Sequence, residues 1–274
     1  MKKPNLPRVV TFDGEARSGK GTIVQATKDY LRDERGHTVM LIDLGQVFRV
    51  LVVAISNAHI DVDSPEAIDA FLSDEANVKT STQLVKDVYH MSKAERDALL
   101  YTNEISANSA KVGARPLSQT FKDTILKKWM QDAAEEGYDT VLLDGRALEE
   151  TASHLEDEQL CDFVLGLYFV CDPVVGSRRT LGFALQPYES LTEADKHSVD
   201  SLVEQIKERN HADQTRSVQP VVPPRGAETY ALPALPITLA TDDRPMVIID
   251  TSAELTRDAM ALPVARMVAA ALET

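Results

Sequence analysis

The hydrophobic positions of the chain fall into short apolar runs separated by longer segments of mixed polarity. Five runs have the length of strands: 8–12, 37–45, 138–145, 162–172 and 245–250. The run at 162–172 is apolar at nearly every position, which is typical of a central strand buried on both faces. In the intervening segments apolar residues recur three and four positions apart, which predicts helices. This alternation predicts an α/β fold of three layers, with a five-stranded parallel sheet and helices on both faces.

Two helical segments, approximately 52–135 and 176–218, are too long to be simple crossovers between strands. The first contains two clear helix starts, with Ser64 before Pro65 and a capping box from Ser92 to Glu95. We therefore expect a single domain over residues 1–274 with two mostly helical insertions. The Pro-rich segment 219–245 predicts irregular structure with at most a small hairpin.

A glycine-containing loop follows the first apolar run, in the stretch RVVTFDGEARSGKGTIVQ (residues 8–25). Gly14, four further residues and then Gly19-Lys20 match the spacing of a phosphate-binding loop. In such a loop backbone N–H groups point at a polyphosphate, the next helix presents its positive end, and the lysine reaches the β and γ oxygens. An ordinary turn is the alternative, but the strand before the loop and the amphipathic helix after it favour phosphate binding. The predicted ATP-binding residues are Gly14, Glu15, Ala16, Arg17, Ser18, Gly19, Lys20, Gly21 and Thr22.

The charge balance and the apolar content limit the partners of the chain. A net charge of −14 argues against nucleic acid, because a polyanion is repelled. The apolar stretch after the basic N-terminus is too short for a signal peptide, and no run approaches the length of a membrane span. Cys161 and Cys171 flank an extended run, which would place them roughly 33 Å apart, beyond disulfide reach. We expect a cytoplasmic protein with reduced cysteines, working as a monomer, with no membrane partner and no protein-built metal site.

Several blocks resemble the cytidylate kinases, a family of nucleoside monophosphate kinases in the P-loop superfamily. The family's Asp-Gly-Pro-Ser-Gly-Ser-Gly-Lys-Gly-Thr corresponds to Asp-Gly-Glu-Ala-Arg-Ser-Gly-Lys-Gly-Thr at 13–22. Its Asp-Ser/Thr-Gly-Ala-x-Tyr-Arg, Asp-Gly-Arg-Asp and Arg-Asp-x-Arg-Asp-x-x-Arg correspond to 43–49, 144–147 and 209–216. The order is kept over nearly the whole chain, and the likeness is weakest at 62–103 and 221–245. The chain thus resembles a divergent member of that family.

The resemblance implies roles for individual residues in transfer of a phosphoryl group from ATP to a nucleotide. Such transfer depends on positioning and charge neutralisation, and an acceptor phosphate needs no general base. Asp144 would hold Mg²⁺, the expected cofactor, through water. The residues that would act on the transferring group, with Arg178 or Arg179 closing from a lid at 176–218, are Lys20, Arg146, Arg178, Arg179 and Arg216. The residues that would bind the acceptor are Asp43, Arg49, Gln119, Arg146, Asp213 and Arg216.

Arg209, Asp213 and Arg216 lie four and three positions apart, so a continuous helix places them on one face. By itself this spacing favours a solvated ladder of ion pairs. The family spacing favours the other interpretation, in which Asp213 orients the acceptor ribose and Arg216 binds phosphate.

The chain departs from the family where the acceptor base is recognised. Leu44, Ala110, Gln119 and Ala147 stand where the family has a hydroxyl, a serine, an arginine and an acidic residue. The last three groups recognise cytosine in the family, and a site that loses such hydrogen bonds loses discrimination. We therefore expect phosphoryl transfer to a monophosphate, with CMP or dCMP as the first candidate. The alternatives are another nucleotide or a small anionic metabolite as acceptor, or a non-catalytic nucleotide-binding protein.

Overall fold

The computed structural model describes residues 6–236 and 245–273. The chain divides into two compact units, of which the first is Met1–Ile42 together with Asp132–Thr274 and the second is Asp43–Gln131. None of the helices in the described ranges combines the length and the apolar character needed to cross a bilayer. Cys161 and Cys171 are both buried and free.

The sheet in the described part of the chain has six strands in the order β2-β3-β1-β4-β6-β5. Every strand pair whose register is described is parallel. The strands are β1 (Arg8–Gly14), β2 (Val39–Asp43), β3 (Thr140–Asp144), β4 (Asp162–Val170), β5 (Glu228–Ala231) and β6 (Met246–Asp250).

The prediction of five strands was wrong by one, because β5 lies in the segment that was expected to be irregular. This strand is only four residues long and mostly exposed, so it lacks the apolar run that marks the other strands. The strand pairs in parallel with β6, with Thr229 opposite Ile248. The small hairpin considered for this segment is not seen in its described part, and residues 237–244 lie outside the described residues.

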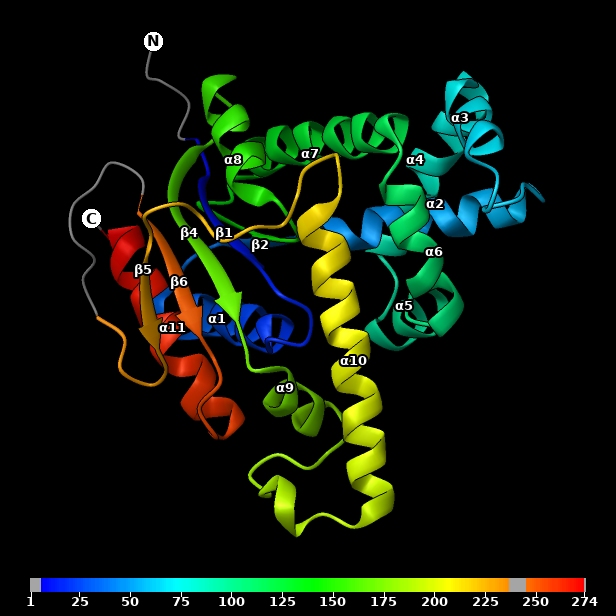
Figure 1. The fold of residues 1–274 in the computed structure, drawn as a ribbon. Helices are drawn as coiled ribbons and strands as arrows, with labels where there is room; N and C mark the ends of the chain where they lie inside the picture. Colours follow the sequence, from blue (N-terminus) through cyan, green and yellow to red (C-terminus); the bar gives the residue numbers. More distant parts are fainter. Residues whose placement is uncertain (1–5, 237–244, 274) are drawn as a thin grey trace. The chain divides into compact units, whose positions relative to one another are not determined.

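Helices cover both faces of the sheet in the first unit (Figure 1). Val10 and Phe12 of β1 point into a core shared with α1 (Lys20–Arg35) and α11 (Arg257–Glu273). Side chains alternate between faces along a strand. Asp13, on the opposite face, accepts a hydrogen bond from the first residue of α8 (Leu148–Asp157). The predicted arrangement of helices on two sides of a parallel sheet is thus confirmed.

The strand order reverses between β1 and β4, which are neighbours in the sheet. From β1 the chain continues to β2 and β3 on one side, whereas from β4 it continues to β5 and β6 on the other. In open parallel sheets ligands bind beyond the carboxyl ends of the strands at such a reversal. The loop after Gly14 lies at this position.

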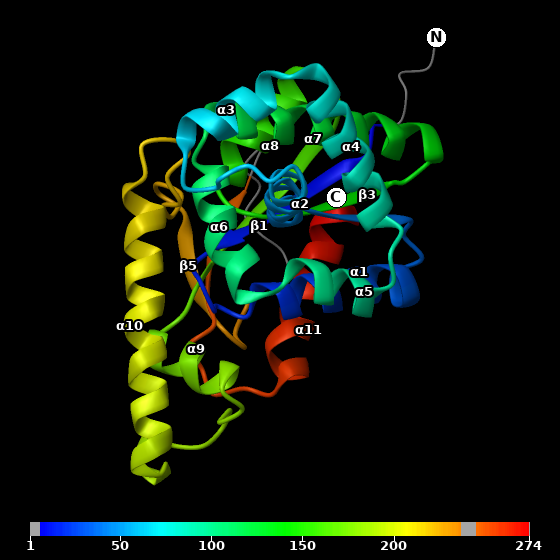
Figure 2. The same ribbon diagram turned by 90° about the vertical axis from the view of Figure 1, so that its right-hand side faces the viewer.

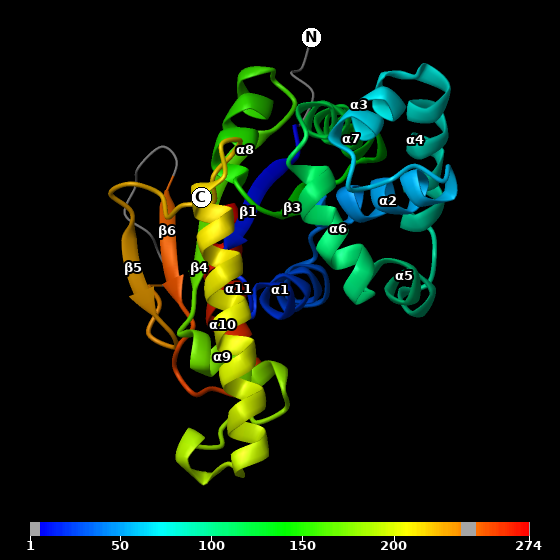
Figure 3. The same cartoon turned by 45° about the vertical axis from the view of Figure 1, so that its right-hand side comes forward.

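Two helices follow β4 and pack on each other. They are α9 (Pro173–Thr180) and α10 (Glu193–Thr215), joined by a segment with a short 3₁₀ turn at Tyr188–Ser190. Val199 and Val203 of α10 form a small apolar cluster with Leu191, packed against Val174 of α9. Figures 2 and 3 show α10 as a long helix with α9 at its side.

The second unit is helical throughout. Its helices are α2 (Leu44–Asn57), α3 (Pro65–Ser73), α4 (Glu75–Tyr89), α5 (Lys93–Leu100), α6 (Asn103–Gly113) and most of α7 (Pro116–Glu136). The two predicted helix starts are confirmed, because Ser64 caps α3 and Ser92 forms a capping box with Glu95 at α5.

Gly14→Ala is expected to destabilise the first unit severely. Gly14 has a φ of +133°, and a Cβ there would lie 2.2 Å from the carbonyl oxygen of Phe169. We expect a loss of roughly 3 kcal/mol or more in the free energy of unfolding, measured by urea denaturation. Gly21→Ala is the control, because nothing lies within 4 Å of its Cβ. Equal midpoints for the two variants would contradict this account of the turn.

Candidate functional site

The loop after β1 is held against the carboxyl ends of its neighbouring strands. The Glu15 N–H donates to the Phe169 carbonyl of β4 at 2.8 Å. The Thr251 hydroxyl, directly after β6, donates to the Ser18 carbonyl at 2.8 Å. Arg17, where the family has glycine, adopts a left-handed conformation with a φ of 60°. These contacts fix the path of the loop from β1 into α1.

The start of α1 is not capped by any described side chain. Gly19 precedes the helix in a left-handed conformation, and the first turn holds no acidic residue. The first N–H groups of a helix have no partner within it, and the helix dipole makes this end positive. Such an end is suited to binding an anion.

Lys20, the first residue of α1, directs its ammonium group to the carboxyl ends of β1 and β3. Its Nζ lies 2.5 Å from the Asp144 carboxylate and donates to the carbonyls of Gly145 at 2.5 Å and Phe12 at 3.2 Å. The side chains of Lys20 and Asp144 are only 15% and 17% exposed. The structure therefore brings the predicted donor-binding lysine and the predicted metal-holding carboxylate together.

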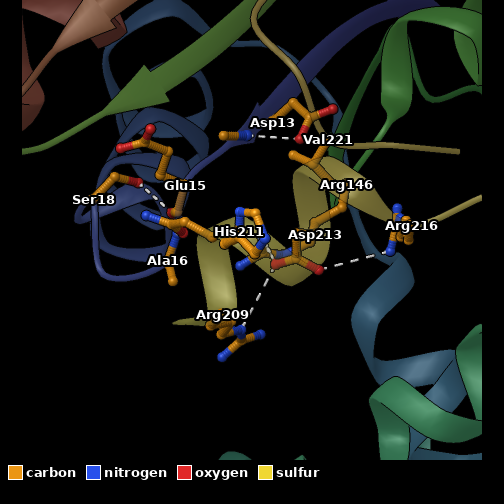
Figure 4. A network of polar contacts seen from close by, with 12 residues as sticks. Asp13, Glu15, Ala16, Ser18, Arg146, Arg209, His211, Asp213, Arg216 and Val221 are labelled. Carbon is orange, nitrogen blue, oxygen red and sulfur yellow. Dashed lines mark hydrogen bonds and ion pairs between the residues drawn. The ribbon is translucent and has the colours of Figure 1, made fainter. Parts of the chain in front are cut away.

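Three arginines surround one carboxylate near this loop, and we call Arg146, Arg209, Asp213 and Arg216 the arginine cluster (Figure 4). Arg146 forms a short ion pair with Asp213, while Arg216 and Arg209 lie 3.8 and 3.9 Å from its oxygens. Burial lowers the pKa of Arg216, and the charge of Asp213 opposes this effect. With more cations than anions, the cluster is suited to an anionic ligand.

The loop and α10 are joined through Asn210, a residue to which the sequence assigned no role. The Ala16 N–H donates to Asn210 Oδ1 at 2.8 Å. Asn210 occupies the position after Arg209 at which the family has aspartate. This correspondence is the feature of the sequence that could have pointed to a role for Asn210.

Asp13 is a second residue to which the sequence assigned no chemistry. Its buried carboxylate accepts hydrogen bonds from the N–H groups of Gly14 at 2.6 Å and Leu148 at 2.8 Å. Ala147, the residue before α8, is left-handed and its side chain cannot cap the helix. Burial raises the pKa of Asp13, while Lys20 and the two backbone donors oppose the rise. Asp13 therefore caps α8 from a strand 135 positions earlier.

Arg178 and Arg179 of α9 make their polar contacts outside the arginine cluster. Arg178 pairs with Glu254 and donates to the Gln186 carbonyl. Arg179 donates to the Ala253 carbonyl. In this structure both arginines hold α9 to the segment between β6 and α11.

Gly176 of α9 lies against the loop after β1. A Cβ at Gly176 would stand 2.9 Å from the carbonyl oxygen of Arg17. The backbones of α9 and the loop are therefore in direct contact.

The other predicted acceptor residues, Asp43, Arg49 and Gln119, belong to the second unit. Asp43 caps α2 and accepts a hydrogen bond from the Tyr101 hydroxyl at 3.1 Å. The Arg49 guanidinium lies 4.6 Å from the centroid of the Tyr101 ring. Burial, above all, raises the pKa of Tyr101. Gln119 donates through Nε2 to the Gly113 carbonyl at 2.5 Å, whereas its Oε1 is buried without a partner.

Among the described residues, no group of three or more His, Cys, Asp or Glu side chains is placed to coordinate a metal ion. Asp144 is a single carboxylate at the edge of the loop. It fits Mg²⁺, which keeps several waters and is bound through one or two carboxylates together with substrate phosphates.

The chain is distantly similar to cytidylate kinases over most of its length. The cytidylate kinase of Shewanella pealeana is 27% identical over 222 residues, covering 80% of this chain and 85% of the relative. That of Colwellia psychrerythraea is 22% identical over 239 residues, covering 84% and 91%. That of Klebsiella pneumoniae is 39% identical, but over only 64 residues, 23% of this chain and 25% of the relative. No protein-family model matches the chain. These similarities support a cytidylate kinase-like relationship of a divergent kind.

Proposed function

We propose that this chain is a nucleoside monophosphate kinase that transfers the γ-phosphoryl group of ATP directly to a monophosphate acceptor, with CMP or dCMP as the first candidate. The observation that carries the proposal is the position of Lys20 beside Asp144 at the uncapped start of α1. The distant similarity to cytidylate kinases supports it.

The donor side uses the backbone of the loop and one side chain. The first N–H groups of α1, those before Thr22, would bind the phosphate oxygens, because a helix leaves its first N–H groups without partners of its own. Lys20 exchanges its contacts with the Phe12 and Gly145 carbonyls for oxygens of the transferred group. Since phosphoryl transfer is governed by orientation and charge, these groups supply what the donor half needs.

Mg²⁺, if bound together with the nucleotide, would neutralise charge on its phosphates. Asp144 is the residue that would hold the ion, through water rather than directly. Its present contact with Lys20 keeps that carboxylate at the edge of the loop.

The acceptor side uses the arginine cluster. Arg146 and Arg216 bind the acceptor phosphate and the charge that develops during in-line transfer, while Asp213 orients the ribose. An acceptor phosphate is already an anion at neutral pH, so no residue has to remove a proton. Arg178 and Arg179 would join only after leaving Glu254 and the Ala253 carbonyl.

A different acceptor is the second candidate, and Gln119 is the observation that favours it. Its amide nitrogen is engaged by the Gly113 carbonyl, in a position where the family has an arginine that recognises cytosine. The side chains of Ala110 and Ala147 cannot form a hydrogen bond with a base edge. Another nucleotide or a small anionic metabolite would then take the place of CMP.

ADP release from ATP and Mg²⁺, measured with a panel of nucleoside monophosphates, tests the proposed function. We expect release that depends on the acceptor, and Lys20→Ala should reduce it by a factor on the order of 10²–10³ or more, because the transition state loses its cation. Lys28→Ala, in the same helix, is the control and should leave it unchanged. ADP release by Lys20→Ala at the wild-type rate would show that the donor site is wrongly assigned. ATP binding without release for any acceptor would favour a non-catalytic nucleotide-binding protein.

Gln119→Arg is expected to change which base is accepted rather than the rate with every acceptor. An added guanidinium supplies donors to a base edge, so kcat/KM for CMP relative to AMP should rise about tenfold. The measurement compares kcat/KM over the acceptor panel, with Gln83→Arg, an exposed change in the same unit, as the control. An unaltered order of acceptors would place base recognition elsewhere.

A further inference from the structure

Arg49 lies in an unusual setting for a predicted phosphate ligand. Its guanidinium is 4.6 Å from the centroid of the Tyr101 ring, over the ring face. One turn earlier in α2, a Cβ at Gly45 would approach Arg49 Nη1 to 3.0 Å. The guanidinium therefore contacts an aromatic face and a helix surface that carries no side chain.

The Tyr101 ring is itself fixed by polar contacts to the start of α2. Its hydroxyl donates to Asp43 Oδ2 at 3.1 Å and accepts from Gln46 Nε2 at 3.3 Å. Gln46 Nε2 also lies 3.2 Å from the same carboxylate oxygen, and Asp43 caps the helix. A residue just after α5 is thereby tied to the first turn of α2.

This arrangement holds the arginine without a direct ion pair, although a Cβ at Gly45 would also lie 3.0 Å from Asp43 Oδ1. Arg49 Nε is buried without a hydrogen-bond partner, and no ion pair of Arg49 with a carboxylate is found among the described residues. A ring face attracts a cation but leaves its charge and its N–H donors available. A carboxylate in the same place would compete with an incoming phosphate.

We propose that Tyr101 is a positioning residue for the acceptor, which orients the Arg49 guanidinium to bind the acceptor phosphate. This inference rests on the proposed function and on the role of acceptor ligand that the resemblance to cytidylate kinases implies for Arg49. Tyr101 lies in the segment 62–103, where the resemblance to the family is weakest, so the family motifs give it no role. Tyr101 is 44% exposed, so its ring is not a core residue held by packing alone. The contacts with Asp43, Gln46 and Arg49 therefore call for another explanation.

Tyr101→Leu removes both the ring face and the hydroxyl and is the decisive variant. We expect KM for the best acceptor to rise about tenfold while kcat and KM for ATP change less than about twofold, because ground-state binding is lost. Tyr101→Phe keeps the ring and should raise KM about two- to threefold. Tyr89→Leu is the matched control, since Tyr89 is 39% exposed in the same unit. An unchanged acceptor KM in Tyr101→Leu, or an equal change in the KM for ATP, would overturn the proposal.

The NMR signal of the Arg49 side-chain Nε–H, identified with Arg49→Lys, gives a readout that does not depend on turnover. A proton over a ring face resonates upfield of its usual position. The Nε–H signal should therefore be shifted upfield in the wild type and in Tyr101→Phe, and should lie at the usual position for arginine in Tyr101→Leu. Absence of that displacement in the folded wild type would overturn the proposal by itself. If no acceptor is phosphorylated, the proposed function fails, whereas the NMR result still decides whether Tyr101 orients Arg49.

Discussion

The close approach of Gly14 to the backbone of Phe169 is the constraint on which the candidate site depends. At this point β1 lies so near β4 that no side chain fits, and the chain turns through a backbone conformation that strongly favours glycine. The turn leads the loop over the ends of the strands and starts α1 at Lys20. It also brings that ammonium back beside Asp144 of β3. The backbone conformation of Gly14 therefore determines where the Lys20 ammonium lies relative to the Asp144 carboxylate.

The distribution of charge within the first unit contrasts with the net charge of the chain. Although the protein carries a net charge of −14, three guanidinium groups gather around Asp213, and a lysine lies at the end of β1. Holding cations close together is costly, because they repel one another and lose hydration, unless a carboxylate or a ligand compensates. Asp213 compensates in part, and a bound phosphate would compensate the rest. The cluster thus has a physical reason to bind anions that the surface charge alone would repel.

The sequence predicted those parts of the structure that depend on local patterns. Apolar runs located the five long strands, the glycine spacing located the loop, and the caps at Ser64 and Ser92 followed from neighbouring residues. The strand β5 was not predicted, because it is short and exposed and has no apolar run. The cap that Asp13 gives to α8 and the bond from Ala16 to Asn210 join residues far apart in the chain, and no periodicity encodes such pairs. For the same reason the contacts of Arg178 with Glu254, and of Tyr101 with Asp43, became visible only in the structure.

The contact between Gly176 and the Arg17 carbonyl has a mechanical consequence. Because no side chain lies between the two backbones, the loop and the middle of α9 are in direct contact and would move together. Packed backbones transmit displacement because they cannot be compressed. If an entering anion displaced the peptide groups of the loop, α9 would have to shift with it, and α10 would follow through the apolar cluster that joins the two helices.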